Sequence, residues 1–193
     1  MELRKNTTSS GEAVQPVYQI VASGRDCFTT FYRSLKQRVV KLNLEKWNQA
    51  NPNGGKVFND ANGNQILTIE LEDTVGLFKE VYKQYQSDLS HYFRNLYTIV
   101  RFVHDSELKI DKQKYMRLIR AQLSAYELTM LFYNCLANYG SGKFKQYIEE
   151  YHLLKNLDME LLIRNVDRRG YCVSAFGAPA KPHVTPPNNM NNQ

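Results

Sequence analysis

The sequence has few cysteines, and none of them form a pattern that a known chemistry uses. Cys27, Cys135 and Cys172 lie far apart, and neither a C-x-x-C pair nor a cluster of cysteine with histidine occurs. An odd number of scattered cysteines argues against a disulfide framework and a zinc site, and is typical of proteins in a reducing compartment. We therefore expect no bound metal and no cofactor.

Long apolar runs are also missing. The longest, residues 123–137, is interrupted by Glu127 and Asn134. It is shorter than the roughly 20 residues that a helix needs to span a bilayer. Residues 1–16 lack the apolar core of a signal peptide. These absences predict a cytoplasmic protein that does not use a membrane.

Motifs of phosphate chemistry are weak or absent. Gly54-Gly55-Lys56 lacks the other glycine and the Ser or Thr of a P-loop, so it is interpreted as a turn. Helical ribonucleases of the HEPN type place a histidine shortly after an arginine. Here Arg94 precedes His104 by ten residues and Arg101 precedes it by three. This spacing lowers the case for a nuclease but leaves the hypothesis open.

The composition is that of one helical or mixed domain with many aromatic residues. The 193 residues include 13 Tyr and 9 Phe but a single Trp, and the formal net charge is +6. This length suffices for a proper core. A mildly basic balance permits binding of nucleic acid or of an acidic partner without requiring it, and a solvated basic surface is the simpler interpretation.

The pattern of apolar residues indicates helices along most of the chain. Asp73 and Asp111 are candidate caps for the second and third helices, Ser87 is a candidate break, and Gly140 ends the third helix. Segment 164–171 is basic and is interpreted as a solubilising helix end. The apolar period predicts helices over residues 17–49, 74–105, 112–139, 141–155 and 158–164.

The remaining segments are turn-rich or polar. Asn62-Gly63 is a preferred hairpin turn, and its flanks at 56–58 and 65–69 predict a small β-hairpin. The expected fold is therefore mainly α: a helical bundle of three long and two or three short helices with a β-hairpin insertion. The predicted organisation is a disordered leader (1–14), a single helical domain (15–170) and a disordered tail (171–193).

Several stretches together resemble the AbiC-like family of phage abortive infection proteins. These stretches are HYFRNLYTIVRFV from His91, RAQLSAYELTMLFYN from Arg120 and GKFKQYIEEYHLLKNL from Gly142, and the likeness extends from Phe28 to about Leu157. Members often carry transmembrane helices before this region. The resemblance implies a role in bacterial defence, in which an infected cell stops growing or dies before phage mature. It assigns no active site.

The third predicted helix carries polar residues at helical spacing among apolar neighbours. Arg120, Ser124 and Glu127 are four and three residues apart, so on one continuous helix they would share a face. Buried charge is costly unless it is paired, so we expect a polar network with the preceding helix. This network is either structural or a cleft for a phosphate or nucleotide. The candidate cleft residues are His91, Arg94, Asn95, Tyr97, Arg101, Arg120, Gln122, Ser124, Glu127 and Asn134.

Three functional hypotheses follow. The first is a cytosolic anti-phage protein that binds an unknown phage or host component through this cleft. The second is a ribonuclease or nucleotide-directed toxin that uses the same cleft together with His91 or His104. The third is a helical adaptor subunit of a multi-gene defence system. Nucleic acid and a second copy of the chain are possible partners.

Overall fold

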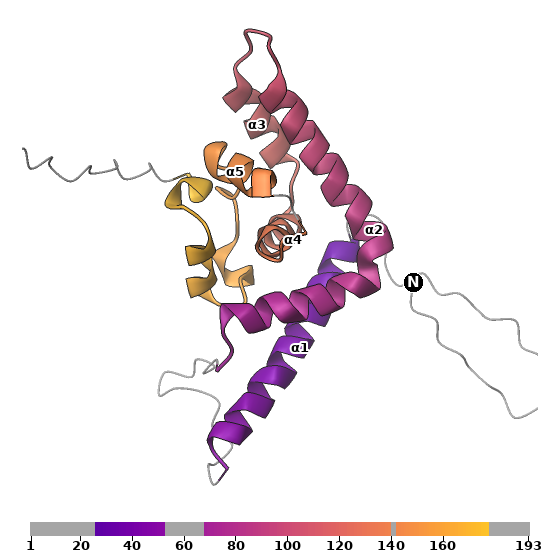
Figure 1. Cartoon of the computed structure of the whole chain (residues 1–193), viewed down its shortest axis with the longest axis vertical. Coiled ribbons are helices and arrows are strands. Elements are labelled where there is room, and N and C mark those ends of the chain that lie inside the picture. Colours follow the sequence, from indigo (N-terminus) through magenta and orange to yellow (C-terminus); the bar gives the residue numbers. More distant parts are fainter. Residues whose placement is uncertain (1–25, 53–67, 140–141, 178–193) are drawn as a thin grey trace, which may run out of the picture.

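The computed structural model describes residues 26–52, 68–139 and 142–177 (Figure 1). Over these ranges the chain forms five α-helices and three short 3₁₀-helices and no strand. The prediction of a mainly α fold is confirmed, whereas the β-hairpin is not seen. Residues 53–67 lie outside the described ranges, and Thr68 and Ile69, at the end of the predicted second strand, are not in a strand. The predicted leader also lies outside them.

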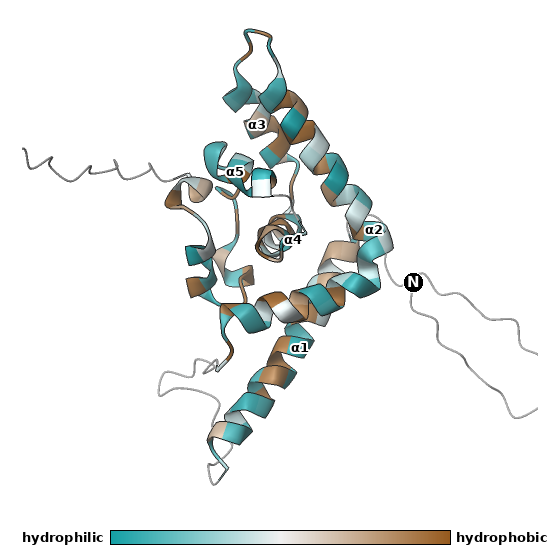
Figure 2. Cartoon of the chain, in the orientation of Figure 1, coloured by the Kyte–Doolittle hydropathy of each residue, from teal (hydrophilic) through white to brown (hydrophobic). Residues whose placement is uncertain are grey.

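The first two helices form one side of the fold. α1 (Asp26–Ala50) packs against α2 (Leu71–Asp105). The rings of Phe31 on α1 and Phe78 on α2 meet between the two helices, with centroids 5.2 Å apart. Figure 1 shows α2 as two arms joined at a bend, although the helix is continuous through Ser87. Hydrophilic and hydrophobic residues alternate along both helices (Figure 2), which is the pattern of amphipathic helices with one buried face.

The start of α2 differs from the prediction by three residues. Glu70 is the N-cap, and Asp73, predicted as the cap, is instead the third residue of the helix. The Glu70 side chain accepts from the Asp73 backbone, and the Asp73 carboxylate accepts from the Glu70 N–H at 2.8 Å. This reciprocal capping box satisfies two donors that the first turn of a helix leaves free.

α4 (Ala125–Leu136) lies at the centre of the fold and is seen almost end-on in Figure 1. α1, α2 and α5 (Gly142–Glu150) all contact it, and so does the first of the 3₁₀-helices. Residues 127–135 are all buried. Helices that are buried all round are usually apolar on every face, so the buried polar side chains of Glu127, Thr129 and Asn134 stand out in it.

The C-terminal segment closes the fold with three 3₁₀-helices, η1 (Met159–Leu161), η2 (Asn165–Gly170) and η3 (Val173–Phe176). The Tyr171 hydroxyl donates to the carbonyl of Phe132 at 2.9 Å, and the Leu154 N–H donates to the carbonyl of the fully buried Ala175 at 3.0 Å. The prediction that the tail begins at 171 is therefore wrong for residues 171–177, because these contacts anchor them. Residues 178–193 lie outside the described ranges.

Candidate functional site

The helix predicted over residues 112–139 is in fact two helices, α3 (Lys112–Ala121) and α4. Asp111 caps α3 as predicted, because its carboxylate accepts from the Lys114 N–H at 3.0 Å. Between the helices, Ser124 is the N-cap of α4. Its hydroxyl accepts from the Glu127 N–H at 3.3 Å, and the Glu127 carboxylate accepts from the Ser124 N–H at 2.7 Å. Ser124 and Glu127 thus begin a helix instead of sharing a face with Arg120.

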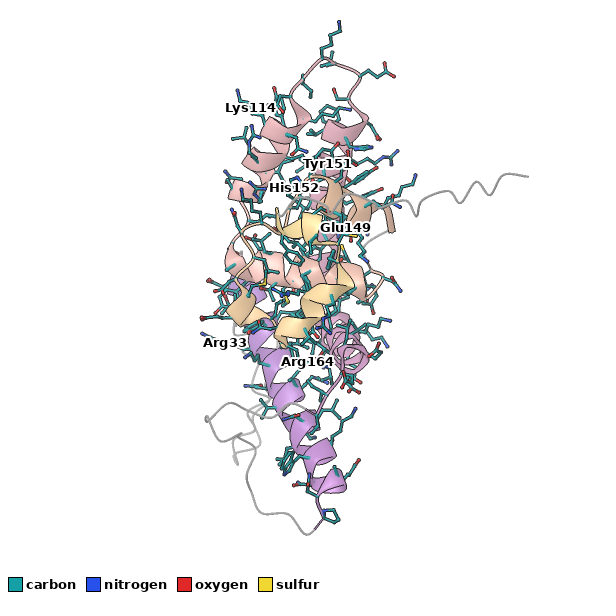
Figure 3. All side chains as sticks on the ribbon, turned by 90° about the vertical axis from the view of Figure 1, so that its left-hand side faces the viewer. Arg33, Lys114, Glu149, Tyr151, His152 and Arg164 are labelled. Atoms are coloured by element: carbon teal, nitrogen blue, oxygen red, sulfur yellow. The ribbon has the colours of Figure 1, made fainter. Side chains whose placement is uncertain are left out.

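The predicted polar network consequently takes another form. Arg120, on α3, donates to the backbone carbonyl of His152 at 2.9 Å. Arg101 pairs with Asp105 one turn further along α2, with 3.0 Å between Nε and Oδ2. Figure 3 shows His152 beside Tyr151, between Lys114 and Arg164 along the long axis. The Arg120 contact holds the end of α3 against the loop after α5, whereas the exposed Arg101–Asp105 pair contributes little to stability.

Most of the predicted cleft residues on α2 face solvent. His91, Arg94, Asn95 and Arg101 are exposed, and so is Gln122 in the break between α3 and α4. The other histidine considered for catalysis, His104, has its Nδ1 2.8 Å from the Tyr151 hydroxyl and its ring against Tyr147. The ten predicted residues therefore do not form a single cleft.

Three of the predicted residues, Arg94, Tyr97 and Asn134, do meet at a cavity of about 280 Å³ between α2, the end of α4 and α5. We call it the tyrosine pocket. The residues that line it are Tyr82, Gln86, Ser90, Phe93, Arg94, Tyr97, Asn134, Tyr139 and Phe144.

Asn134 is the most unusual side chain of the tyrosine pocket. It is only 1% exposed, and neither its Nδ2 nor its Oδ1 has a hydrogen-bond partner among the described residues. The hydroxyl of Tyr82 is near enough to this amide for the contact to lower the pKa of Tyr82, against the larger effect of burial, which raises it. Buried polar atoms without partners are rare in proteins, so this amide needs an explanation that packing does not supply.

The walls of the tyrosine pocket are aromatic. The rings of Tyr82 and Tyr139 stack with centroids 4.4 Å apart and an interplanar angle of 19°. Tyr97 meets Phe144 edge-on at 5.3 Å. Arg94 is the one charged residue among those lining the cavity, and none of them is a carboxylate. The pocket therefore combines flat apolar walls, an unpartnered amide and one positive charge.

Sequence reasoning missed six of the residues that line the tyrosine pocket. Tyr82, Gln86 and Ser90 follow one another at intervals of four on α2, with Arg94 four residues further on, so this row along one side of the helix was a usable signal. Phe93 lies close to that row. By contrast, Tyr139 and Phe144 come from other parts of the chain, and only the fold brings them to α2.

A second buried polar cluster joins α4 to η2. The Tyr133 hydroxyl donates to Oδ2 of Asp167 at 2.9 Å and accepts from the Ile163 N–H at 2.8 Å. Oδ1 of Asp167 faces Nε of Arg164 at 3.7 Å. Burial raises the pKa of Asp167, while the Tyr133 hydroxyl and Arg164 oppose that shift. No cavity among those described is lined by these residues, so we assign the cluster to stability.

Two further features bear on the kind of site. Among the described residues, no three His, Cys, Asp or Glu side chains converge as a set of metal ligands. None of the helices in the described ranges combines the length and the apolar character needed to cross a membrane.

The comparison with known proteins points to one family. No curated protein and no solved structure matches the chain. A family model does match it, over a region that runs from the middle of α2 to η1 and contains every residue of the tyrosine pocket except Tyr82. Residues 84–162 of this chain match the family described as putative phage abortive infection protein, which confirms the resemblance seen in the sequence over that region.

Proposed function

We propose that this chain acts in abortive infection and that it does so by binding a phage or host component in the tyrosine pocket. The family match supports the biological role. The observation that supports the site is Asn134, which lines an aromatic cavity and whose buried Nδ2 and Oδ1 have no hydrogen bond of standard geometry among the described residues. Apolar cavities with a few convergent polar groups are the usual form of a ligand site.

The free-energy cost of burying its amide supports a binding role for Asn134. Burying an amide without hydrogen bonds costs about 1–3 kcal/mol. A leucine at this position would fill a similar volume without that cost. A bound ligand that supplies hydrogen bonds to this amide would explain why an asparagine, which is unfavourable for folding, occupies this position.

The enzymatic alternative has less support. A ribonuclease or nucleotide-directed toxin that used this pocket would need an acid–base group in it. Neither His91 nor His104 is among the residues that line the pocket, and no carboxylate is. Tyrosine hydroxyls are its remaining acid–base groups, and burial raises the pKa of Tyr82, which makes it a poorer base at neutral pH. Binding is therefore the function that the geometry supports best.

An adaptor role is favoured by a different surface. Phe102, Leu108 and Leu118 are 78%, 73% and 57% exposed. Leu108 lies in the connection between α2 and α3, Phe102 in the last turn of α2 and Leu118 in the second half of α3. Figure 1 shows this connection projecting at the top of the molecule. Exposed apolar patches of this kind often mark contacts with other proteins, so this end is the natural docking surface of an adaptor.

Phage plating on bacteria that express the chain tests the proposal. Arg94→Gln removes the positive charge of the tyrosine pocket from an exposed position, so we expect protection to be lost while protein abundance and melting temperature stay unchanged. Arg101→Gln, two helical turns further along α2, is the matched control and should protect like the wild type.

The same assay separates the alternatives. If Arg94→Gln and Asn134→Leu both protect as well as the wild type, the tyrosine pocket is not the functional site. If protection instead disappears with Phe102→Ser in a folded protein, the adaptor role is supported.

A further inference from the structure

The residues that line the tyrosine pocket indicate the chemical class of its ligand. A carboxamide presents a donor beside an acceptor in one plane. The complementary ligand edge is planar and also carries one donor and one acceptor side by side. Nucleobases have such edges, and asparagine is one of the side chains that read them by two hydrogen bonds. The Asn134 amide, which lies beside the Tyr82 hydroxyl and has no hydrogen bond of standard geometry among the described residues, is the group of the pocket suited to this.

The aromatic walls favour a flat ligand. Tyr82 and Tyr139 already stack on each other, and Phe93, Tyr97 and Phe144 add further ring surface to the cavity. Bases stack on aromatic side chains with a gain of about 1–3 kcal/mol per base. Tyr139 is 42% exposed, so one wall of the pocket is accessible from solvent.

The charge of the cavity favours an anion at its mouth. Arg94 is exposed and lines the pocket, and no carboxylate among the lining residues opposes it. A guanidinium binds phosphate through paired hydrogen bonds. Gln86 and Ser90, next to Arg94 on α2, offer uncharged groups to sugar hydroxyls.

The size of the cavity suits a small ligand such as one nucleotide. Its volume of about 280 Å³ lies just below the range of roughly 300–1,000 Å³ that is common for small-molecule sites. A base with its sugar fits such a volume, with the phosphate at the opening.

We propose that the tyrosine pocket binds a free nucleoside monophosphate, with the base against Asn134 between the aromatic walls and the phosphate on Arg94. This inference rests on the proposed function in one respect, namely that the pocket is the binding site used in defence. It adds the chemical class of the ligand.

Isothermal titration calorimetry of the full chain tests the proposal. The probes are AMP, CMP, GMP and UMP, the corresponding nucleosides, inorganic phosphate, and a short single-stranded RNA. We expect at least one monophosphate to bind more tightly than its nucleoside and than phosphate alone. Binding of RNA only, or of none of these probes, would overturn the proposal.

Two variants assign the contacts. Arg94→Gln should lower the affinity for the monophosphate by about 10- to 100-fold, as expected for loss of a charge-assisted hydrogen bond. Its affinity for the nucleoside should be unchanged. Arg101→Gln should bind like the wild type. Asn134→Leu should lower the affinity for nucleoside and monophosphate alike, while the melting temperature of the variant does not fall. Unchanged affinity in Arg94→Gln would contradict the proposed pose, whatever the folding of Asn134→Leu.

The outcomes also separate this inference from the proposed function. If Arg94→Gln loses phage protection but no nucleotide binds the wild type, the pocket is functional and its ligand class is wrong. If nucleotides bind and Arg94→Gln lowers their affinity, yet the variant still protects against phage, the proposed ligand class is correct and the pocket is not the site used in defence.

Discussion

At the scale of single residues, Tyr133 illustrates how one hydroxyl can tie distant segments together. Its side chain is fully buried, and its hydroxyl serves Asp167 as donor and Ile163 as acceptor. Burial, together with the neighbouring Asp167, raises the pKa of Tyr133 well above its ordinary value. The hydroxyl therefore stays protonated and keeps its role as a donor.

We expect Tyr133→Phe to lower the free energy of unfolding by about 1–3 kcal/mol, because it leaves the Ile163 N–H and the Asp167 carboxylate without their partner. Urea denaturation measures the change. Tyr115→Phe, on the exposed side of α3, is the control and should stay within about 0.5 kcal/mol of the wild type. Equal stability of the Tyr133 variant and the wild type would show that the cluster contributes nothing.

The sequence allowed only part of the candidate site to be predicted at this scale. Arg94, Tyr97 and Asn134 were identifiable because each interrupts or borders an apolar helical pattern. Tyr139 was not, since its place depends on how α4 meets α2. The partner of Tyr133 lies 34 residues away, in the segment interpreted as a solubilising helix end, and no local pattern connects the two.

At the scale of elements, the break between α3 and α4 shows a local signal that outweighs periodicity. The apolar pattern runs on through residues 122–124 and predicts one helix. Ser124 and Glu127, however, form the S-x-x-E signature of a capping box ahead of an apolar run. That signature was present in the sequence, and it correctly marks a new helix start.

Ser124→Ala should lower the free energy of unfolding by about 0.5–2 kcal/mol, since it removes the acceptor for the Glu127 N–H at the start of α4. Chemical denaturation measures this loss, and Ser124→Asp, which keeps a capping oxygen, should restore most of it. If the cap were instead part of the binding site, Ser124→Asp would fold normally but lose phage protection.

At the scale of the whole molecule, three distant segments meet where α2 begins. Lys46 on α1 donates to the Asp73 carboxylate, and Arg164, from the C-terminal segment, binds the carbonyl of Ile69 and the carboxylate of Glu70. Asn43 also accepts from the Thr68 N–H at 2.6 Å. This junction fixes α1, α2 and the C-terminal segment relative to one another.

The junction should make stability depend on pH. The pKa of Asp73 is lowered, first by the hydrogen bond from the Glu70 N–H and then by Lys46. A lowered pKa in the folded state means that the carboxylate stabilises the fold above its ordinary pKa near 3.8 and that this contribution is lost as the pH falls below it.

We accordingly expect Asp73→Asn to be less stable than the wild type by about 1 kcal/mol at pH 7. The difference should shrink in acid, because the wild-type carboxyl then becomes protonated and neutral like the amide. Thermal unfolding followed from pH 7 down to about pH 2, below the lowered pKa of Asp73, measures both curves. A difference that does not vary with pH would indicate that the ionised carboxylate is not the cause.

The overall architecture could be predicted further than the site. Helical periodicity and caps located α1 and α2 well where residues are described, and predicted α5 with its end five residues too late. They could not show that residues 171–177 are anchored, because Tyr171 and Ala175 gain their burial from α4 and from the segment after α5. A stretch rich in small residues resembles a free tail until its packing partners are known.

The central position of α4 has a consequence for how the protein is made. Its apolar surface is covered in part by α1 and α2, which precede it, but also by α5, η1 and Tyr171, which leave the ribosome later. During synthesis, α4 therefore keeps part of its apolar surface exposed until nearly the last described residue has left the ribosome. Exposed apolar surface of this kind invites chaperones and aggregation, so translation speed and chaperone supply will govern the yield of folded protein.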